Sequence, residues 1–271
     1  MKPILSAKSD YVFKLIFGDK RNTDVLAGLL SSVLKIPRSE YDELTIIDPH
    51  VKKEAEKDKY GILDVKLTTK SDYVIHIEIQ VLEIPAMIPR IIYYQSKMVT
   101  EQIGSGKDWD SIQRVVSIII TDFPFGPQND KYHNQVRYRT DDGLEFTDLT
   151  EINILQLQKL PSVTDNSDLW DWLEFIRTDN EEVLNMLQER SPEMRKAVGF
   201  LKELSADERT RMLAESRENA RRDEASRIKG AVLGSLFSVV KNAKDMGMDT
   251  DSIIKLTGLT REEIEQPKKR S

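Results

Sequence analysis

Three short runs rich in β-branched residues constrain the fold of this chain more than any other feature. They read ELTIIDPHV (43–51), GILDVKLTT (61–69) and YVIHIEIQV (73–81). Such residues favour extended backbone, so each run predicts a strand. The polar residues Thr69 to Asp72 separate the second run from the third. We therefore expect the last two strands to form a hairpin.

Helical patterns flank these runs. The stretch SDYVFKLIFGDKRNTDVLAGLLSSVLKIP (9–37) predicts two helices, the first capped by Asp10 or Ser9, interrupted at Gly18, and the second capped by Thr23. A further helix is expected from about Pro89 to Ile103, and the apolar run RVVSIIITDF (114–123) predicts a buried strand. The predicted order is helix, three strands, helix, strand.

The second half of the chain changes from mixed to helical character. Turn residues and short β-like runs between 123 and 160 predict additional strands. From Ser167 onward the pattern is helical, and residues 206–247 predict a long charged helix that breaks near Gly230 or Gly234. We read this helix as an arm or a partner-binding element.

The last segment, MDTDSIIKLTGLTREEIEQ (248–266), predicts two small helices. Asp249 or Thr250 can cap the first, Gly258 suits its end, and Thr260 with Glu263 forms a capping box for the second. The pair is either part of a helix-turn-helix or a small packing hairpin. The expected domains are 1–160, a helical arm at 161–248, and a C-terminal helical hairpin at 249–271.

Composition narrows the function classes. The chain of 271 residues has no cysteine, which excludes disulfides, thiolate metal sites and a cysteine nucleophile. No apolar run is long enough to cross a bilayer and the start MKPILSAKSD lacks a signal-peptide pattern, so we expect a cytoplasmic protein without a membrane partner. The net charge of −6 does not favour coating nucleic acid by long-range attraction alone.

Acidic residues interrupt two of the predicted strands. Asp64 lies among Ile62, Leu63 and Val65, and Glu78 and Gln80 alternate with Ile77, Ile79 and Val81. Side chains alternate faces along a strand, so Glu78 and Gln80 project to one side. If the two strands pair as a hairpin, Asp64 can lie close to Glu78 on that face.

Two adjacent carboxylates repel each other unless a cation neutralises them. Oxygen ligands of this kind suit Mg²⁺, with Mn²⁺ as a second option, and the backbone carbonyl of Ile79 can add a ligand. Such a metal polarises a phosphate and activates a bound water. The alternative is that Asp64 and Glu78 simply occupy the solvated face of an antiparallel sheet.

The motifs SDYVFKLIFG, KYGILDV, IHIEIQ and RIIYYQSKM together resemble the Rpn family of recombination-promoting nucleases and transposases, a branch of the PD-(D/E)XK superfamily. The resemblance runs from about Lys2 to Phe123, and the tail also looks like the ending of many members. It implies an α/β, restriction-endonuclease-like core of helix, three strands, helix and strand, with a helical C-terminal extension. It places the metal-binding acids on Asp64 and Glu78.

One position departs from the commonest pattern of the superfamily. Gln80 stands where a lysine is usual, and a glutamine is neutral and can only donate or accept hydrogen bonds. Glutamine is also what the resembling family tends to have there, so the resemblance implies a variant active site of Asp64, Glu78 and Gln80.

Further residues are weaker candidates. Asp10 is a candidate metal ligand, although helix capping explains it as well. Arg90, Tyr94 and Lys97 follow at helical spacing and match the family's helix, so they are candidate DNA contacts, with a core position as the alternative for Tyr94.

These observations predict a metal-dependent DNA endonuclease that hydrolyses phosphodiester bonds, linked by resemblance to recombination or mobile elements. The partner is DNA, and symmetric double-strand cleavage predicts a homodimer. The alternative is a catalytically weak or inactive nuclease fold that binds DNA or a protein. A strand-transfer enzyme of the DDE type fits less well, because its acids are spread over a longer stretch than this hairpin.

Overall fold

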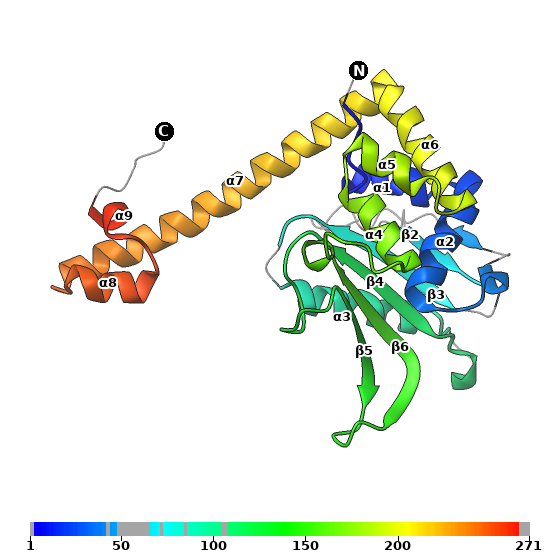
Figure 1. Ribbon diagram of the computed structural model, residues 1–271. Coiled ribbons are helices and arrows are strands. Elements are labelled where there is room, and N and C mark those ends of the chain that lie inside the picture. Colours follow the sequence, from blue (N-terminus) through cyan, green and yellow to red (C-terminus); the bar gives the residue numbers. More distant parts are fainter. Residues whose placement is uncertain are drawn as a thin grey trace. The chain divides into compact units, whose positions relative to one another are not determined.

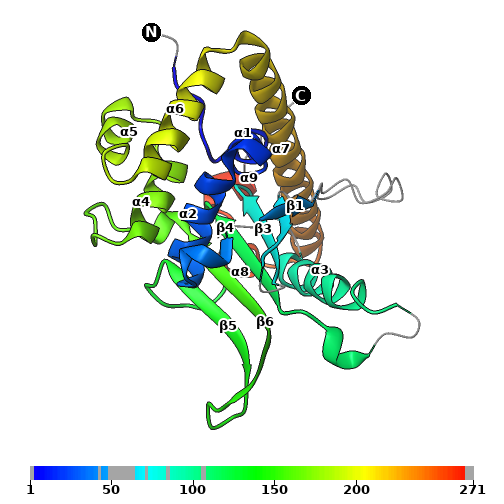
Figure 2. The same cartoon turned by 90° about the vertical axis from the view of Figure 1, so that its right-hand side faces the viewer.

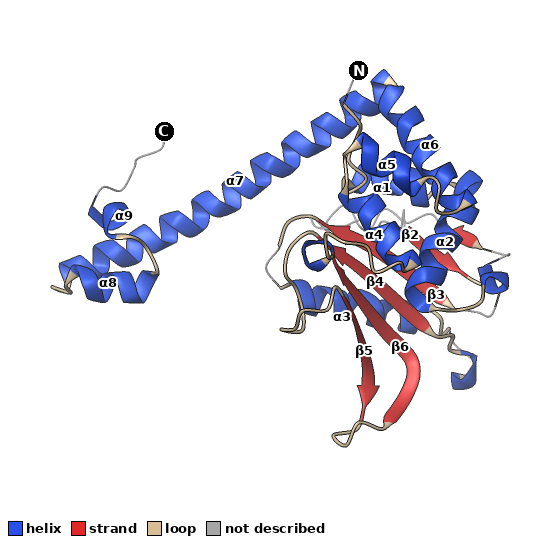
Figure 3. Ribbon diagram, viewed as in Figure 1, coloured by secondary structure: helices blue, strands red, loops and turns tan. Residues whose placement is uncertain are grey.

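The computed structural model describes residues 3–41, 44–47, 65–70, 73–83, 86–104 and 108–265. It is a mixed α/β protein with one six-stranded sheet and helices (Figures 1 and 3). Residue contacts divide the chain into two compact units, Met1–Ala214 and Glu215–Ser271. The domain boundaries expected after residues 160 and 248 stay predictions.

The first unit contains helices and strands, and the described elements of the second unit are helical. The strands are β1 Thr45–Ile47, β2 Val65–Thr68, β3 Val74–Gln80, β4 Val115–Thr121, β5 His133–Arg139 and β6 Glu145–Gln156. The α-helices are α1 Asp10–Phe17, α2 Thr23–Leu34, α3 Met87–Thr100, α4 Asp168–Arg177, α5 Glu181–Leu187, α6 Pro192–Ala206, α7 Glu208–Asp245, α8 Thr250–Thr257 and α9 Arg261–Glu265.

The two N-terminal helices form as predicted, but their starts differ in detail. Ser9 occupies the N-cap of α1 without a side-chain cap bond. Asp19 accepts a hydrogen bond from the Arg21 backbone N–H and starts a short 3-10 turn that leads into α2. Thr23 is therefore the first residue of α2 and not its cap, because the preceding turn already bends the chain into the helix.

The sheet has the order β1-β2-β3-β4-β6-β5. β2 and β3 are antiparallel, with Val65 opposite Ile77, which confirms the predicted hairpin. β3, β4 and β6 run parallel, and β5 pairs antiparallel with β6. The strands predicted between residues 123 and 160 are thus confirmed as β5 and β6.

Helices cover both faces of this sheet (Figure 2). One face packs against α1, α2, α4, α5 and α6 in the main core, to which β3 contributes Ile75, Ile77 and Ile79. The opposite face packs against α3, where Met87 and Ile91 contact Ile119 of β4. The alternation along β3 therefore assigns its apolar residues to the main core and its polar residues to the α3 side.

The main core brings α2 and α4 into close contact. A side chain at Gly28 of α2 would come within 2.6 Å of the Trp172 ring of α4. The absence of a Cβ at this position lets the indole pack against the helix backbone, which fixes α2 over the sheet.

The second unit is helical. α7 continues through Gly230 and Gly234, so the predicted break is wrong. Asp249 caps α8, and Gly258 ends it in the left-handed conformation. Thr260 and Glu263 exchange hydrogen bonds through side chain and backbone, which confirms the predicted capping box. Within the described residues, no helix is both long and apolar enough to cross a membrane.

Candidate active site

The candidate site lies on the face of β3 that α3 covers. His76 and Glu78 are buried and Gln80 is half-buried. Cα pairing places Glu78 beside Ile119 of β4, whose side chain packs against α3. The predicted common face of Glu78 and Gln80 agrees with this register.

Glu78 is 3% exposed, and its two hydrogen-bond donors among the described residues contact the same carboxylate oxygen. Gln80 Nε2 donates to Oε1 at 2.7 Å, and Arg90 Nη2 donates to Oε1 at 2.8 Å. Within the described part of the chain, Oε2 accepts no hydrogen bond. A carboxylate can accept about four hydrogen bonds, so Glu78 keeps unused capacity on Oε2.

Arg90 reaches Glu78 from the first turns of α3. Its guanidinium lies over the Tyr94 ring, 5.6 Å from the centroid, one helical turn further along. Its Nε is buried and donates no hydrogen bond within the described residues. Arg90 and Tyr94 were predicted from the sequence as DNA contacts, and the structure adds that Arg90 forms an ion pair with Glu78.

His76 is the other buried polar group on this face. Burial, together with the charges of Arg90 and Lys66, lowers the pKa of His76 to about 3. The imidazole is therefore neutral near pH 7. Its Nε2 and the Oγ of Ser117, the residue beside it on β4, have no hydrogen-bond partner among the described residues.

The other residues predicted from the sequence do not join Glu78 in the described part of the site. Asp64 lies outside the described residues. The side chain of Ile79 packs in the main core. Asp10 is exposed at the start of α1, where Oδ1 accepts from the Tyr11 backbone N–H. Lys97 lies 3.9 Å from Glu101, one turn along α3, and is not a contact of Glu78.

Sequence reasoning missed a charged pair at the carboxyl ends of β3 and β4. The backbone N–H of Asp122 donates to the carbonyl of Gln80, and Lys8 Nζ lies 2.9 Å from Asp122 Oδ2. The two residues are 114 positions apart. No local pattern signals such a pair, because it depends on how folding brings the segment before α1 to the end of β4.

The side-chain donors around Glu78 indicate whether a divalent metal fits this site. Within the described residues, no three His, Asp or Glu side chains gather as a metal site. Glu78 offers one carboxylate whose Oε2 has no partner among the residues that the structure describes, and Gln80 offers an amide oxygen because its Nε2 is committed to Glu78. These are hard oxygen donors of the kind that Mg²⁺ prefers, and a second carboxylate would complete the set.

Comparison with known proteins identifies the family. The sequence matches the model of the PD-(D/E)XK nuclease family transposase over residues 7–231. This match covers most of the chain, including the sheet and the helices around it, so the protein belongs to that family. No curated protein and no solved structure matches it. Membership indicates a nuclease-type function.

Proposed function

We propose that the protein is a metal-dependent DNA endonuclease that hydrolyses phosphodiester bonds, with its site at Glu78. The observation that carries the proposal is a buried carboxylate with one oxygen that accepts no hydrogen bond from the described residues, on the α3 side of a β-hairpin in a chain of this family. Buried polar atoms normally have at least one hydrogen-bond partner, so a carboxylate oxygen without one is a candidate position for a bound ion or water.

Asp64 is the proposed partner of Glu78. Val65 pairs with Ile77 in the β2–β3 ladder, and Asp64 and Glu78 are the next residues of the two sequences. We propose that both carboxylates and the backbone carbonyl of Ile79 hold Mg²⁺, with Mn²⁺ as a substitute and Asp10 as a further ligand. The bound metal supplies a polarised phosphate and a water of lowered pKa.

The protein's own groups have separate roles in this proposal. Gln80 orients the attacking water through its amide, which is held by the hydrogen bond to Glu78. Arg90 fixes the rotamer of Glu78 through their ion pair, and the other Nη of its guanidinium donates to the phosphate. The ring of Tyr94 positions the Arg90 guanidinium through a cation–π contact. Lys97 contacts the DNA backbone further along α3.

A plasmid cleavage assay tests the proposal. Purified full-length protein is incubated with supercoiled and linear DNA in Mg²⁺, Mn²⁺ or EDTA. Asp64→Asn and Glu78→Gln are compared with Glu145→Gln, which removes an exposed carboxylate of β6. We expect metal-dependent cutting by the wild type and by Glu145→Gln, and none by the two site variants.

Two other outcomes of the cleavage assay lead to different conclusions. Cutting that survives both site substitutions contradicts this site. Absence of cutting under every condition, with binding to DNA retained, favours a non-catalytic nuclease fold in which the Arg90 ion pair permanently occupies Glu78.

The assembly follows from the chemistry. One core makes one nick, so double-strand cleavage requires two copies, and we propose a homodimer arranged by the helical region 161–248 and the hairpin 249–271. Light scattering of the full chain measures the mass directly, and a monomeric mass at assay concentration contradicts this proposal. A role in recombination or in mobile elements is likewise proposed from the family.

A further inference from the structure

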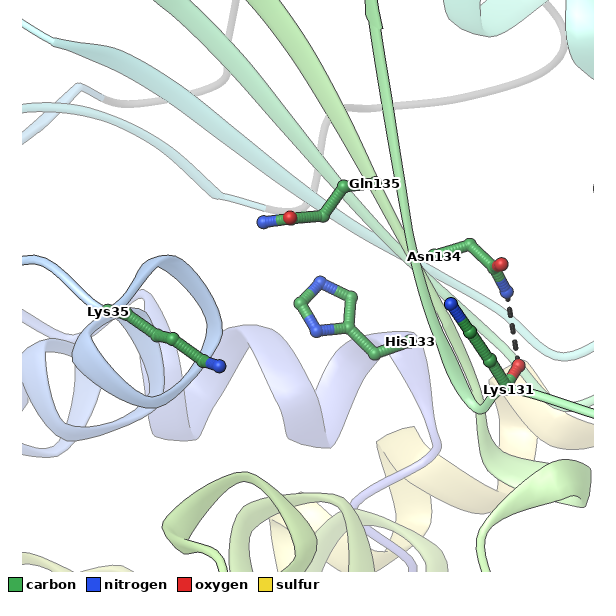
Figure 4. Close-up of a pocket in the computed structure, with 5 residues that line it drawn as sticks. All are labelled: Lys35, Lys131, His133, Asn134 and Gln135. Carbon is green, nitrogen blue, oxygen red and sulfur yellow. Dashed lines mark hydrogen bonds between the residues drawn. The ribbon is translucent and has the colours of Figure 1, made fainter. Parts of the chain in front are cut away.

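A cavity of about 320 Å³ lies at the start of β5, away from Glu78. It is lined by Lys35, Lys131, His133, Asn134 and Gln135 (Figure 4). His133 pairs with Leu155, which packs in the main core, so its ring lies on the sheet face opposite to Glu78. The volume is at the lower end of ligand pockets, which span roughly 300–1,000 Å³.

The described residues of the lining carry positive charge and include no carboxylate. Lys35 ends α2 in the left-handed conformation, with φ 54°, and its side chain points toward the ring of His133 in Figure 4. Within the described part of the chain, neither Lys35 nor Lys131 forms an ion pair. Two unpaired ammonium groups at one small cavity attract an anion, even though the whole chain has a net charge of −6.

Hydrogen bonds fix the tautomer of His133. Asn153 Nδ2 donates to Glu151 Oε1 at 2.8 Å, so the amide oxygen of Asn153 must be the acceptor in its 2.8 Å contact with His133 Nε2. Nε2 therefore carries the proton. Nδ1 makes no hydrogen bond among the described residues, which leaves it available to a ligand.

The loop that carries Lys131 is held in place. The backbone N–H of Lys131 donates to Asn129 Oδ1 at 3.0 Å, and the carbonyl of Lys131 accepts from Asn134 Nδ2 at 3.1 Å. Asn129 and Asn134 are joined to each other at 2.7 Å. The side chain of Asn134 thus supports the loop, and less conformational freedom is lost when Lys131 binds a ligand.

We propose that this cavity is a phosphate-binding site, in which Lys35, Lys131 and the Nδ1 side of His133 hold the phosphate group of a nucleotide or of a nucleic acid backbone. Lysine is a common phosphate ligand, and a histidine beside two lysines donates a further hydrogen bond once protonated. The site is separate from cleavage at Glu78 and does not require it.

If phosphate binds here, the pKa of His133 should change on binding. Burial lowers the pKa of His133, the Asn153 hydrogen bond and Glu151 raise it, and Lys35 lowers it further. The charged groups around the ring are Lys35 from α2, Lys131 before β5, Arg137 on β5 and Glu151 on β6. A bound phosphate dianion offsets the lysine charges, so it raises the pKa of His133.

Binding is measured in EDTA, which separates it from catalysis. The probes are inorganic phosphate, thymidine 5′-monophosphate, and a 20-base-pair duplex without terminal phosphates. The double variant Lys35→Gln/Lys131→Gln is compared with the charge-matched control Lys20→Gln/Lys202→Gln and with Lys35→Arg. We expect the double variant to lose about tenfold in affinity per lysine, while the control and Lys35→Arg bind like the wild type.

The three probes separate the sources of the phosphate. Loss confined to the duplex identifies a backbone phosphate, and loss for phosphate or the mononucleotide identifies a free one. NMR of the histidine rings should show the His133 signal, assigned with His133→Gln, shifting to a higher pKa with the bound probe. Equal binding by the double variant and the control, or no binding of any probe by the wild type, overturns the proposal.

Discussion

Glu78 and Glu151 are both buried carboxylates of the central sheet, 3% and 2% exposed, yet their surroundings differ. They lie on opposite faces, because Glu78 pairs with Ile119 on the α3 side and Glu151 pairs with Val116 of the main core. Burial is costly for any carboxylate that lacks compensating donors or charges.

Glu151 has donors on both of its oxygens. Arg114 and Arg137 contact Oε2 at 2.7 and 2.8 Å, and Asn153 and Gln135 contact Oε1 at 2.8 and 3.4 Å. From the described residues, Glu78 receives one arginine and one amide, both on Oε1. The comparison indicates that Glu151 is committed to holding β5, β6 and the start of β4 together, whereas Glu78 retains capacity for a ligand.

The largest expected effect is on cleavage in Glu78→Gln. Removing a metal ligand costs several kcal/mol of transition-state stabilisation, so we expect at least about a hundredfold loss of kcat/KM. The variant also removes the counter-charge of one arginine, Arg90, although the new amide can still accept its hydrogen bond, so we expect a loss of stability of about 1–2 kcal/mol, smaller than for Glu151→Gln. Cleavage kinetics and urea unfolding measure the two quantities, and an active Glu78→Gln protein would contradict the assignment.

For Glu151→Gln we expect the larger loss of stability and little change in cleavage. Among the described residues, the substitution leaves Arg137 without a counter-charge and Arg114 with Asp148 alone, 3.4 Å away, and since both arginines are partly exposed we expect a loss of about 2–3 kcal/mol in the free energy of unfolding. The cleavage rate per folded molecule should be close to that of the wild type. Unchanged stability would show that Glu151 is not a structural carboxylate.

Arg90 is expected to act through Glu78. Arg90→Gln removes the ion pair and should reduce cleavage by about 10–100-fold, as is typical for residues that orient metal ligands. Arg90→Lys keeps the charge and should recover part of the rate. The metal concentration needed for half-maximal cleavage is the additional readout. If it is unchanged in both variants, Arg90 does not position Glu78.

The smallest expected effect concerns the pH dependence of stability. The pKa of His76 is about 3 in the folded protein, below the ordinary value of 6.5, so the unfolded chain binds the proton more readily between these values. Neutral His76 therefore makes its full contribution to the free energy of unfolding above pH 6.5. This contribution is lost as the pH falls toward 3, at up to about 1.4 kcal/mol per pH unit.

His76→Leu removes this titration. Urea unfolding of both proteins at pH 7 and pH 5 tests the prediction, with the wild type losing more stability than His76→Leu on acidification. Parallel losses in the two proteins would show that His76 is protonated in the folded state, or that it does not titrate between these values in the unfolded chain.

Local patterns were sufficient to predict much of the fold. Alternation of Ile77, Glu78, Ile79 and Gln80 predicted which side chains share a face, and the capping residues of α8 and α9 are defined within a few positions of sequence. Such features depend on neighbours along the chain. The long-helix break near Gly230 was wrong, because a glycine weakens a helix only slightly and the residues around it are good helix formers.

Contacts between distant segments were beyond sequence reasoning. Glu151 is held by side chains from β5 and from the residue before β4, and Lys8 meets Asp122 across 114 positions. The ion pair between Arg90 and Glu78 depends on how α3 lies over β3. These contacts are set by packing of the helices on the sheet, for which a single sequence carries no local signal.

Binding of Mn²⁺ to the full chain tests the central claim most directly, because it requires neither DNA nor turnover. Electron paramagnetic resonance titration would compare the wild type with Glu78→Gln, Asp64→Asn and the exposed-acid control Glu145→Gln. We predict a Mn²⁺ site in the wild type and the control that is lost in both site variants. Equal Mn²⁺ binding by all four proteins would contradict the assignment of Glu78 as a metal-binding carboxylate.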